Sequence, residues 1–285
     1  AILALSAGKP KALTLSVPTA HMPMAIRPVV ADIAPVHVAY TEDGTGRSVM
    51  TGSRAAVPGP LQLEVAGLAR GTTHLLSLHQ DPTPSNRLDL ITGTALVTIA
   101  VPLPAARIVA AIDASEAEDV DLFVGLDGNR DGLPQSGEQL CASADESWTE
   151  YCELASSEPD LVYWVVVQNF TGSEDQPDDI VLVTGAVPAL DAGNLSVTGP
   201  ERILPGETFD LLFDWSVPGL APGDTWFAQV AVGSGPDAHG DLGRIAFDLV
   251  ARAIPPTPTL APTPPPTPDP RAHNVLLPAL RRARP

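Results

Sequence analysis

The sequence predicts an all-β protein made of tandem β-sandwiches, followed by a disordered proline-rich tail. Short apolar stretches alternate with polar residues at a period of two, as at residues 61–65 and 247–250, which is typical of half-buried strands. Turn-forming pairs such as Asp43-Gly44 and Pro205-Gly206 recur at the short intervals seen in β-sandwiches. No segment carries a helical apolar stripe over three turns, so helices are not expected.

The first part of the chain is predicted to be a β-rich region covering residues 1–95. Three segments in it, residues 13–17, 36–40 and 61–65, largely alternate between apolar and polar side chains. The region is interpreted as a sandwich that is truncated at its start.

Residues 96–187 are predicted to form a second, acidic sandwich. The continuous apolar run at 161–167 predicts a central strand covered on both faces, and residues 180–183 form the next strand after an acidic turn at 173–179. A smaller sandwich containing Trp215 and Trp226 is predicted over residues 190–253.

The last segment, residues 254–285, differs in composition. Eleven of the chain's 31 prolines lie in it, which predicts an extended linker of the polyproline II type without a core. It ends in a short apolar tag containing Leu277-Pro278, followed by arginines.

The negative charge is concentrated in one place. The chain has a net charge of −18, and residues 113–179 contain eighteen acidic residues against one basic residue, Arg130. Such a segment repels phosphate backbones and anionic lipids, which argues against nucleic acid as a partner and favours cation binding or simple solubility. No stretch approaches 18 uninterrupted apolar residues, so no transmembrane segment is expected.

Two cysteines, Cys141 and Cys152, are the only ones in the chain. Their close spacing in a turn-rich stretch predicts a disulfide and a secreted or cell-surface location. Two free buried thiols are the alternative, and metal binding by the pair is disfavoured because no histidine lies nearby. The start of the chain, without Met or a basic stretch before its apolar run, is interpreted as the start of a mature piece or a fragment rather than a signal peptide.

One local motif predicts a metal site. Residues 127–138 match the twelve-residue calcium loop, in which Asp127, Asn129, Asp131 and Glu138 supply side-chain oxygens and Leu133 its carbonyl. The flanks are predicted strand and loop rather than helix, so a calcium loop set into a β-scaffold is expected instead of an EF-hand pair. Asp119 and Asp121 are lesser candidates for calcium ligands. The alternative is a β-hairpin whose acidic residues are merely solvated.

No catalytic residue is predicted, because the chain lacks a nucleophile elbow, a zinc-protease motif and a P-loop. Trp148, between the cysteines, is the expected exposed binding aromatic, whereas Trp164 and Trp215 are expected in cores. The sequons at Asn169 and Asn194 match a short pattern that also arises by chance.

Several segments resemble accessory domains of exported bacterial proteases. Residues 111–113, the Asp-Val-Asp-Leu-Phe-Val run at 119–124 and residues 163–169 resemble the pre-peptidase C-terminal β-sandwich found in subtilisin-like serine peptidases. Residues 209–215 and 223–233 resemble the fibronectin type III-like tail domain of such proteases. The resemblance implies jelly-roll or fibronectin III-like sandwiches and a peptidase domain upstream of Ala1, because the subtilisin catalytic signatures are missing from this chain.

The expected function is therefore that of a non-catalytic accessory region of an exported subtilisin-like protease. It would be calcium-stabilised, support folding and attach to a protein or glycan substrate or to the cell surface. The alternative is a stand-alone cell-surface adhesin or carbohydrate-binding protein, since sandwiches host many functions. A hydrolase using an acid pair is the least favoured alternative.

Overall fold

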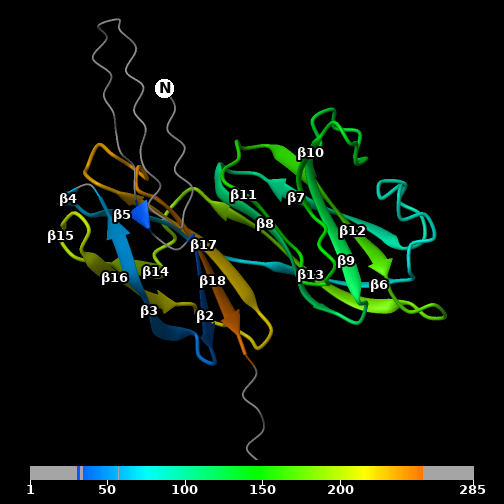
Figure 1. Ribbon diagram of the computed structural model, residues 1–285, viewed down its shortest axis with the longest axis horizontal. Helices are drawn as coiled ribbons and strands as arrows, with labels where there is room; N and C mark the ends of the chain where they lie inside the picture. The colour runs from blue at the N-terminus through cyan, green and yellow to red at the C-terminus, as the bar shows by residue number, and fades with distance from the viewer. Residues whose placement is uncertain (1–30, 33–34, 57, 253–285) are drawn as a thin grey trace, which may run out of the picture. The chain divides into compact units, whose positions relative to one another are not determined.

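The computed structural model describes residues 31–32, 35–56 and 58–252, and within them the chain is all-β, with eighteen strands and no helix (Figure 1). The strand predicted at residues 13–17 and the disordered tail predicted at 254–285 lie outside the described residues. The strands form two sandwiches, each of two four-stranded sheets.

The first sandwich combines strands from both ends of the described chain. One sheet has the order β1 (Ala31–Asp32), β3 (Thr45–Ala55), β16 (Thr208–Ser216), β14 (Leu195–Thr198), and the other β2 (Val36–Thr41), β18 (Gly243–Ala251), β17 (Thr225–Gly233), β5 (Gln62–Arg70). A short pair, β4 (Gly59–Pro60) and β15 (Arg202–Ile203), closes one side. Phe213 and Phe247 stack in the core with ring centroids 4.9 Å apart, and Trp215 is buried beside them as predicted.

The second sandwich contains the strands from Thr72 to Pro188. One sheet has the order β11 (Tyr151–Leu154), β8 (Ala105–Ser115), β13 (Asp178–Pro188), β6 (Thr72–Leu78), and the other β10 (Gln139–Ser143), β9 (Asp119–Leu126), β12 (Leu161–Thr171), β7 (Thr94–Val101). Strand β12 pairs on both sides, with β7 and β9. Val165 and Val167 face the core between the sheets, and Trp164 and Val166 pack under the leucines of the loop before β7. This confirms the predicted central strand.

The observed sheets differ from the predicted succession of three regions at residues 1–95, 96–187 and 190–253. Strand β3 pairs with β16, and β5 pairs with β17, so residues 31–70 and 195–251 share one sandwich. Strand β6 and the loop after it belong to the second sandwich, which is inserted between β5 and β14. Apolar periodicity identifies a strand but not its partner, because strands far apart in sequence bury an alternating face equally well.

The chain passes from the first sandwich to the second, and back again, at two closely packed junctions. Gly71 alone separates β5 from β6, and a Cβ there would lie 2.7 Å from the Val183 side chain and 2.9 Å from the Thr225 carbonyl. At the return crossing, the Asn194 side chain accepts a hydrogen bond from the Leu68 amide and donates one to the Leu68 carbonyl. Asn194, part of a predicted sequon, therefore acts as a structural bridge.

We expect Asn194→Ala to lower the free energy of unfolding by about 1–3 kcal/mol, because the substitution leaves the partly buried Leu68 backbone groups without partners. Urea unfolding of the unglycosylated protein measures the effect. Ser196→Ala is the matched control, since it destroys the same sequon at an exposed position and should change stability by less than about 0.5 kcal/mol. Equal losses in both variants would contradict the bridging role.

The two sandwiches contact each other through β8 and β13 of the second and β5, β17 and β18 of the first. Val109, Val183 and Val187 pack against Phe227 in a small buried cluster. Beside it, the side chain of Arg107 is fully buried and crosses from β8 to the first sandwich. Its guanidinium lies 2.6 Å from the Asp248 carboxylate and also donates to the Ala228 carbonyl at 3.1 Å; the other charged and polar partners, on β11, are Tyr151 and Glu153.

Candidate functional site

The predicted calcium loop is the connection of a β-hairpin in the second sandwich. It joins β9 to β10, two antiparallel neighbours at the edge of their sheet. Gly132 takes a positive φ of 75° at the sharp turn, a conformation that glycine adopts without strain. Asp127, Asn129, Asp131, Leu133 and Glu138 thus lie on one loop, as the motif requires.

The carboxylates of this loop are engaged by donors of the hairpin itself. Both Asp127 oxygens accept amide hydrogen bonds, from Asp131 and from Gly132, each at 3.1 Å. One Glu138 oxygen accepts the Gly128 amide at 2.9 Å and the other accepts the Trp164 indole N–H at 3.2 Å. The loop therefore holds its shape through its own hydrogen bonds, which is the geometry of the hairpin alternative.

Carboxylate oxygens have spare lone pairs after accepting one hydrogen bond, so the donor set still suits a hard cation. However, in the part of the chain that the structure describes, no group of three or more His, Cys, Asp or Glu side chains is arranged to hold a metal ion. Calcium binding by residues 127–138 remains a prediction.

The predicted disulfide is confirmed. Cys141 on β10 and Cys152 on β11 are bonded, with their Cα atoms 5.9 Å apart. The bond links the edge strands of the two sheets and closes the loop between them. Trp148 lies on this loop and is 38% exposed, as predicted, whereas Cys152 is buried in the core.

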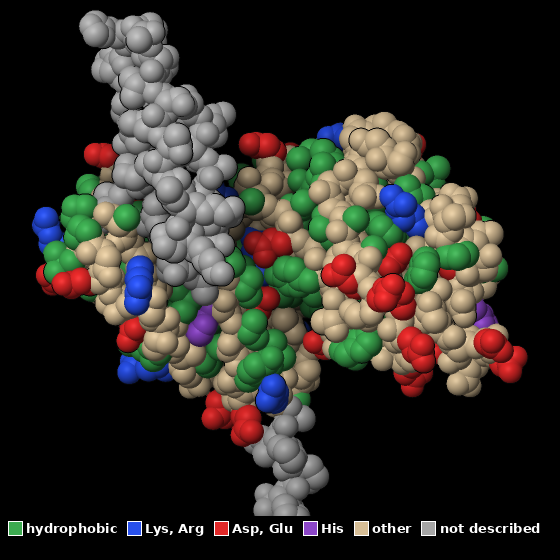
Figure 2. Space-filling model, in the orientation of Figure 1, with side chains coloured by type: hydrophobic (Ala, Val, Ile, Leu, Met, Phe, Trp, Pro, Cys, Tyr) green, Lys and Arg blue, Asp and Glu red, His purple; other side chains and the backbone are tan. Residues whose placement is uncertain are grey.

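A group of acidic side chains surrounds the disulfide-closed loop. Asp119 and Asp121 come from the start of β9, and Asp145, Glu146 and Glu150 come from the loop itself. Figure 2 shows that acidic side chains greatly outnumber basic ones on the visible face of the second sandwich, drawn on the right. We call these five residues the acidic loop cluster.

Glu150 is the least solvated member of the acidic loop cluster. It is only 1% exposed, and neither of its carboxylate oxygens has a hydrogen-bond partner. The Ser143 hydroxyl and the Asp145 amide lie near enough to oppose the rise in its pKa, without reaching hydrogen-bond geometry. Burial raises the pKa of Glu150, and the charges of Asp145 and Asp119 raise it further.

We expect ionisation of Asp121 to destabilise the EDTA-treated protein. Its contribution to the free energy of unfolding should fall as the pH rises from about 4 to about 6. Burial, then the charges of Asp119 and Glu150, raise the pKa of Asp121 from 3.8 to about 6, while Arg87 opposes the rise. The folded state keeps this proton at pH values where the unfolded chain has lost it, so the destabilisation is absent below about pH 4 and complete above about pH 6.

Urea unfolding between pH 4 and pH 7 measures this contribution as the difference between the parent protein and Asp121→Asn. Other carboxylates, such as Asp178 and Asp224, have a lowered pKa in the folded protein. They titrate in both the parent and the variant, so subtracting the two stabilities leaves the contribution of Asp121. A difference that does not change with pH would contradict the raised pKa.

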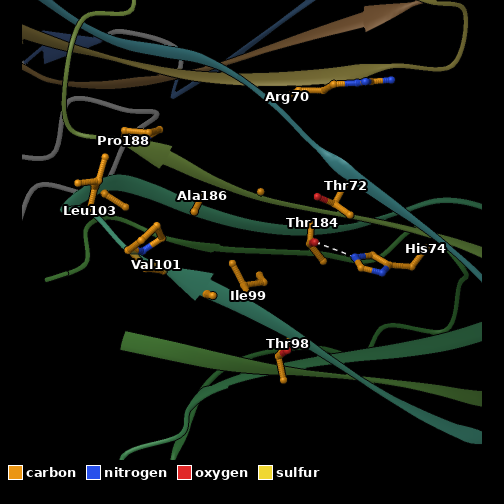
Figure 3. A pocket seen from close by; sticks show the side chains of 14 residues that line it. Arg70, Thr72, His74, Thr98, Ile99, Val101, Leu103, Thr184, Ala186 and Pro188 are labelled. Atoms are coloured by element: carbon orange, nitrogen blue, oxygen red, sulfur yellow. Dashed lines mark hydrogen bonds between the residues drawn. The ribbon is translucent and has the colours of Figure 1, made fainter. Parts of the chain in front are cut away.

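A separate cleft opens along the side of the second sandwich, with β6 and β7 at the edges of its two sheets (Figure 3). Its volume is about 310 Å³. The His74 ring nitrogen Nε2 lies 2.9 Å from the Thr184 hydroxyl, and burial lowers the pKa of His74. Ile99, Val101 and other apolar side chains line the cleft together with the polar Arg70, Thr72 and Thr98.

Sequence reasoning missed the residues whose roles depend on long-range contacts. Glu150 looks like any acid in an acidic turn, and Arg107 is the one charged residue in the apolar stretch at residues 105–112. A charged residue within an apolar strand was the available signal for Arg107. Asn169 was noted only as a sequon, yet it is fully buried and donates to the Leu78 carbonyl and to Asp178.

No helix in the described residues is long and apolar enough to cross a membrane. Comparison of the chain with protein-family models and with curated protein sequences gives no match.

Proposed function

We propose that this chain is a non-catalytic accessory and binding region of an exported subtilisin-like serine protease, acting in the extracellular space or at the cell surface. The observation that carries the proposal is the Cys141–Cys152 disulfide, because such bonds persist in oxidising, extracytoplasmic compartments. The resemblance of residues 111–124 and 163–169 to pre-peptidase C-terminal sandwiches supplies the protease context.

The binding surface in this proposal is the disulfide-closed loop. Trp148 is held partly exposed on a loop whose two ends are fixed to different sheets, so little conformational entropy is lost when it contacts a substrate. Tryptophan is enriched among the residues that dominate binding energies. A protein substrate or cell-envelope polymer is the proposed partner.

Calcium has a stabilising role in this proposal. The side-chain oxygens of Asp127, Asn129, Asp131 and Glu138, with the Leu133 carbonyl, would hold the ion between β9 and β10. A bound ion would stiffen a hairpin that the extracellular environment exposes to proteolysis. The support is the donor chemistry of the loop.

The test is a sedimentation assay of the purified full chain with insoluble protein, such as casein-coated or collagen particles, and with insoluble polysaccharides. We expect retention on protein particles and at least a tenfold weaker affinity for Trp148→Ala. Leu190→Ala, which removes an exposed apolar side chain elsewhere, is the control and should bind normally. Cleavage of casein by this chain alone would contradict the non-catalytic proposal.

A stand-alone carbohydrate-binding protein or adhesin is the second candidate, favoured by the same exposed Trp148, since aromatic rings stack on sugars. Retention on polysaccharide but not on protein particles, abolished by Trp148→Ala, would support it. Retention on neither material would contradict both candidates.

A further inference from the structure

The acidic loop cluster contains buried carboxylate oxygens that make no hydrogen bond, although the Ser143 hydroxyl and the Asp145 amide lie near Glu150. Both Glu150 oxygens and Oδ1 of Asp119 are buried and without a hydrogen-bond partner. Buried carboxylates without partners are rare, because removing their hydration is costly. The cluster therefore requires either a bound proton or a bound cation.

The charged neighbours of these two carboxylates are themselves acids. Asp145 and Asp119 act on Glu150, and Glu146 acts on Asp119. The charge of Arg87 reaches the cluster and opposes the rise in the pKa of Asp121. Its guanidinium is already engaged, stacked 4.6 Å from the centre of the Phe123 ring and donating to Gln139 at 3.0 Å.

We infer that the acidic loop cluster, formed by Asp119, Asp121, Asp145, Glu146 and Glu150, binds one divalent cation of the Ca²⁺ class. The donors are carboxylate oxygens, which suit a hard ion with six to eight ligands. The cluster is distinct from the loop at residues 127–138 and shares no residue with it. The inference does not depend on the proposed accessory function.

The disulfide-closed loop provides the freedom that binding needs. Since no three acidic side chains in the described residues already converge on one point, binding requires side chains to turn inward. Asp145 and Glu146 are exposed side chains that can turn toward the buried Glu150 and the half-buried Asp119. The Cys141–Cys152 bond keeps the backbone of the loop in place during that rearrangement.

The test is calorimetric titration of CaCl₂ into the EDTA-treated full chain at pH 7. We expect binding with a dissociation constant of about 0.1–1 mM, the range of extracellular calcium modules. Glu150→Gln and Asp119→Asn should each weaken this binding at least tenfold. Glu207→Gln, an exposed acid of the first sandwich, should leave it unchanged, whereas Asp131→Asn should remove only the binding proposed for the separate loop at residues 127–138.

Terbium luminescence locates the ion, because Tb³⁺ occupies Ca²⁺ sites and is excited by a nearby tryptophan. Trp148 lies on the disulfide-closed loop, whereas Trp164 contacts Glu138 of the other loop. We expect Trp148→Phe to remove most of the tryptophan-sensitised Tb³⁺ emission while leaving the calorimetric affinity for Ca²⁺ unchanged. Trp164 stays in place in this variant, so any emission that remains reports Tb³⁺ bound near Trp164, at the loop of residues 127–138.

Three results would overturn the inference. The first is Ca²⁺ binding lost in Asp131→Asn and kept in Glu150→Gln, which would place the ion at residues 127–138. The second is no binding up to 10 mM CaCl₂. The third is a neutral Glu150, revealed by Glu150→Gln melting higher than the parent in EDTA while Ca²⁺ shifts neither protein. If circular dichroism shows that Glu150→Gln does not fold, Asp119→Asn takes its place in these comparisons.

Discussion

Replacing Arg107 by Leu is expected to lower the free energy of unfolding by about 3–5 kcal/mol, the largest loss that we expect from any single substitution in this protein. The Arg107 side chain is fully buried, and its removal leaves the Asp248 carboxylate, which is 7% exposed, without its cation. Tyr151 and Glu153 lose the same partner. Urea unfolding, followed by tryptophan fluorescence, measures the loss.

The double variant Arg107→Leu/Asp248→Leu separates the cost of an unpaired charge from the loss of packing. Replacing both members of a buried ion pair by apolar residues is often close to neutral, so the double variant should recover most of the stability. Arg244→Leu, which removes an exposed arginine from the same strand as Asp248, is the control and should change stability by less than about 1 kcal/mol. A double variant less stable than Arg107→Leu would contradict this account.

The second large effect is expected from removing the disulfide. Cys141→Ala/Cys152→Ala should lower the free energy of unfolding by about 2–3 kcal/mol, because the bond closes a short loop and restricts the unfolded chain. Urea unfolding of the variant, and of the parent with and without a reducing agent, measures the change. Reduction should destabilise the parent and leave the variant unaffected.

Comparing single and double substitutions separates the effect of losing the disulfide bond from the effect of losing the cysteine side chains. Single substitutions Cys141→Ala and Cys152→Ala should each lose about as much stability as the double variant, since either one breaks the bond. A double variant as stable as the parent would show that the sheet edges at β10 and β11 are held by packing alone.

Local features of the chain were predictable because local physics controls them. The run at residues 161–167 becomes the central strand β12, since a strand buried on both faces must be apolar at every position. Alternation at residues 36–40, 61–65 and 247–250 likewise corresponds to β2, β5 and β18. The disulfide followed from two cysteines close together in a turn-rich stretch.

The candidate site was predictable only in part. The motif at residues 127–138 identified a tight, oxygen-rich loop, and the structure places it on a hairpin whose own amides engage the carboxylates. The exposed position of Trp148 was also expected. Nothing in the sequence distinguished Glu150 from the other acids around it, because burial depends on how the disulfide-closed loop packs against β9.

The sequence by itself determined the all-β class, the positions of several strands and the disulfide. Each follows from residues close together in the chain. Only the tertiary structure decided that residues 31–70 and 195–251 share one sandwich, that Arg107 meets Asp248 at the contact between sandwiches, and that Glu150 is buried without a hydrogen bond. Strand partners and buried charges depend on contacts between residues far apart in sequence, where many pairings satisfy the same alternation and packing selects one.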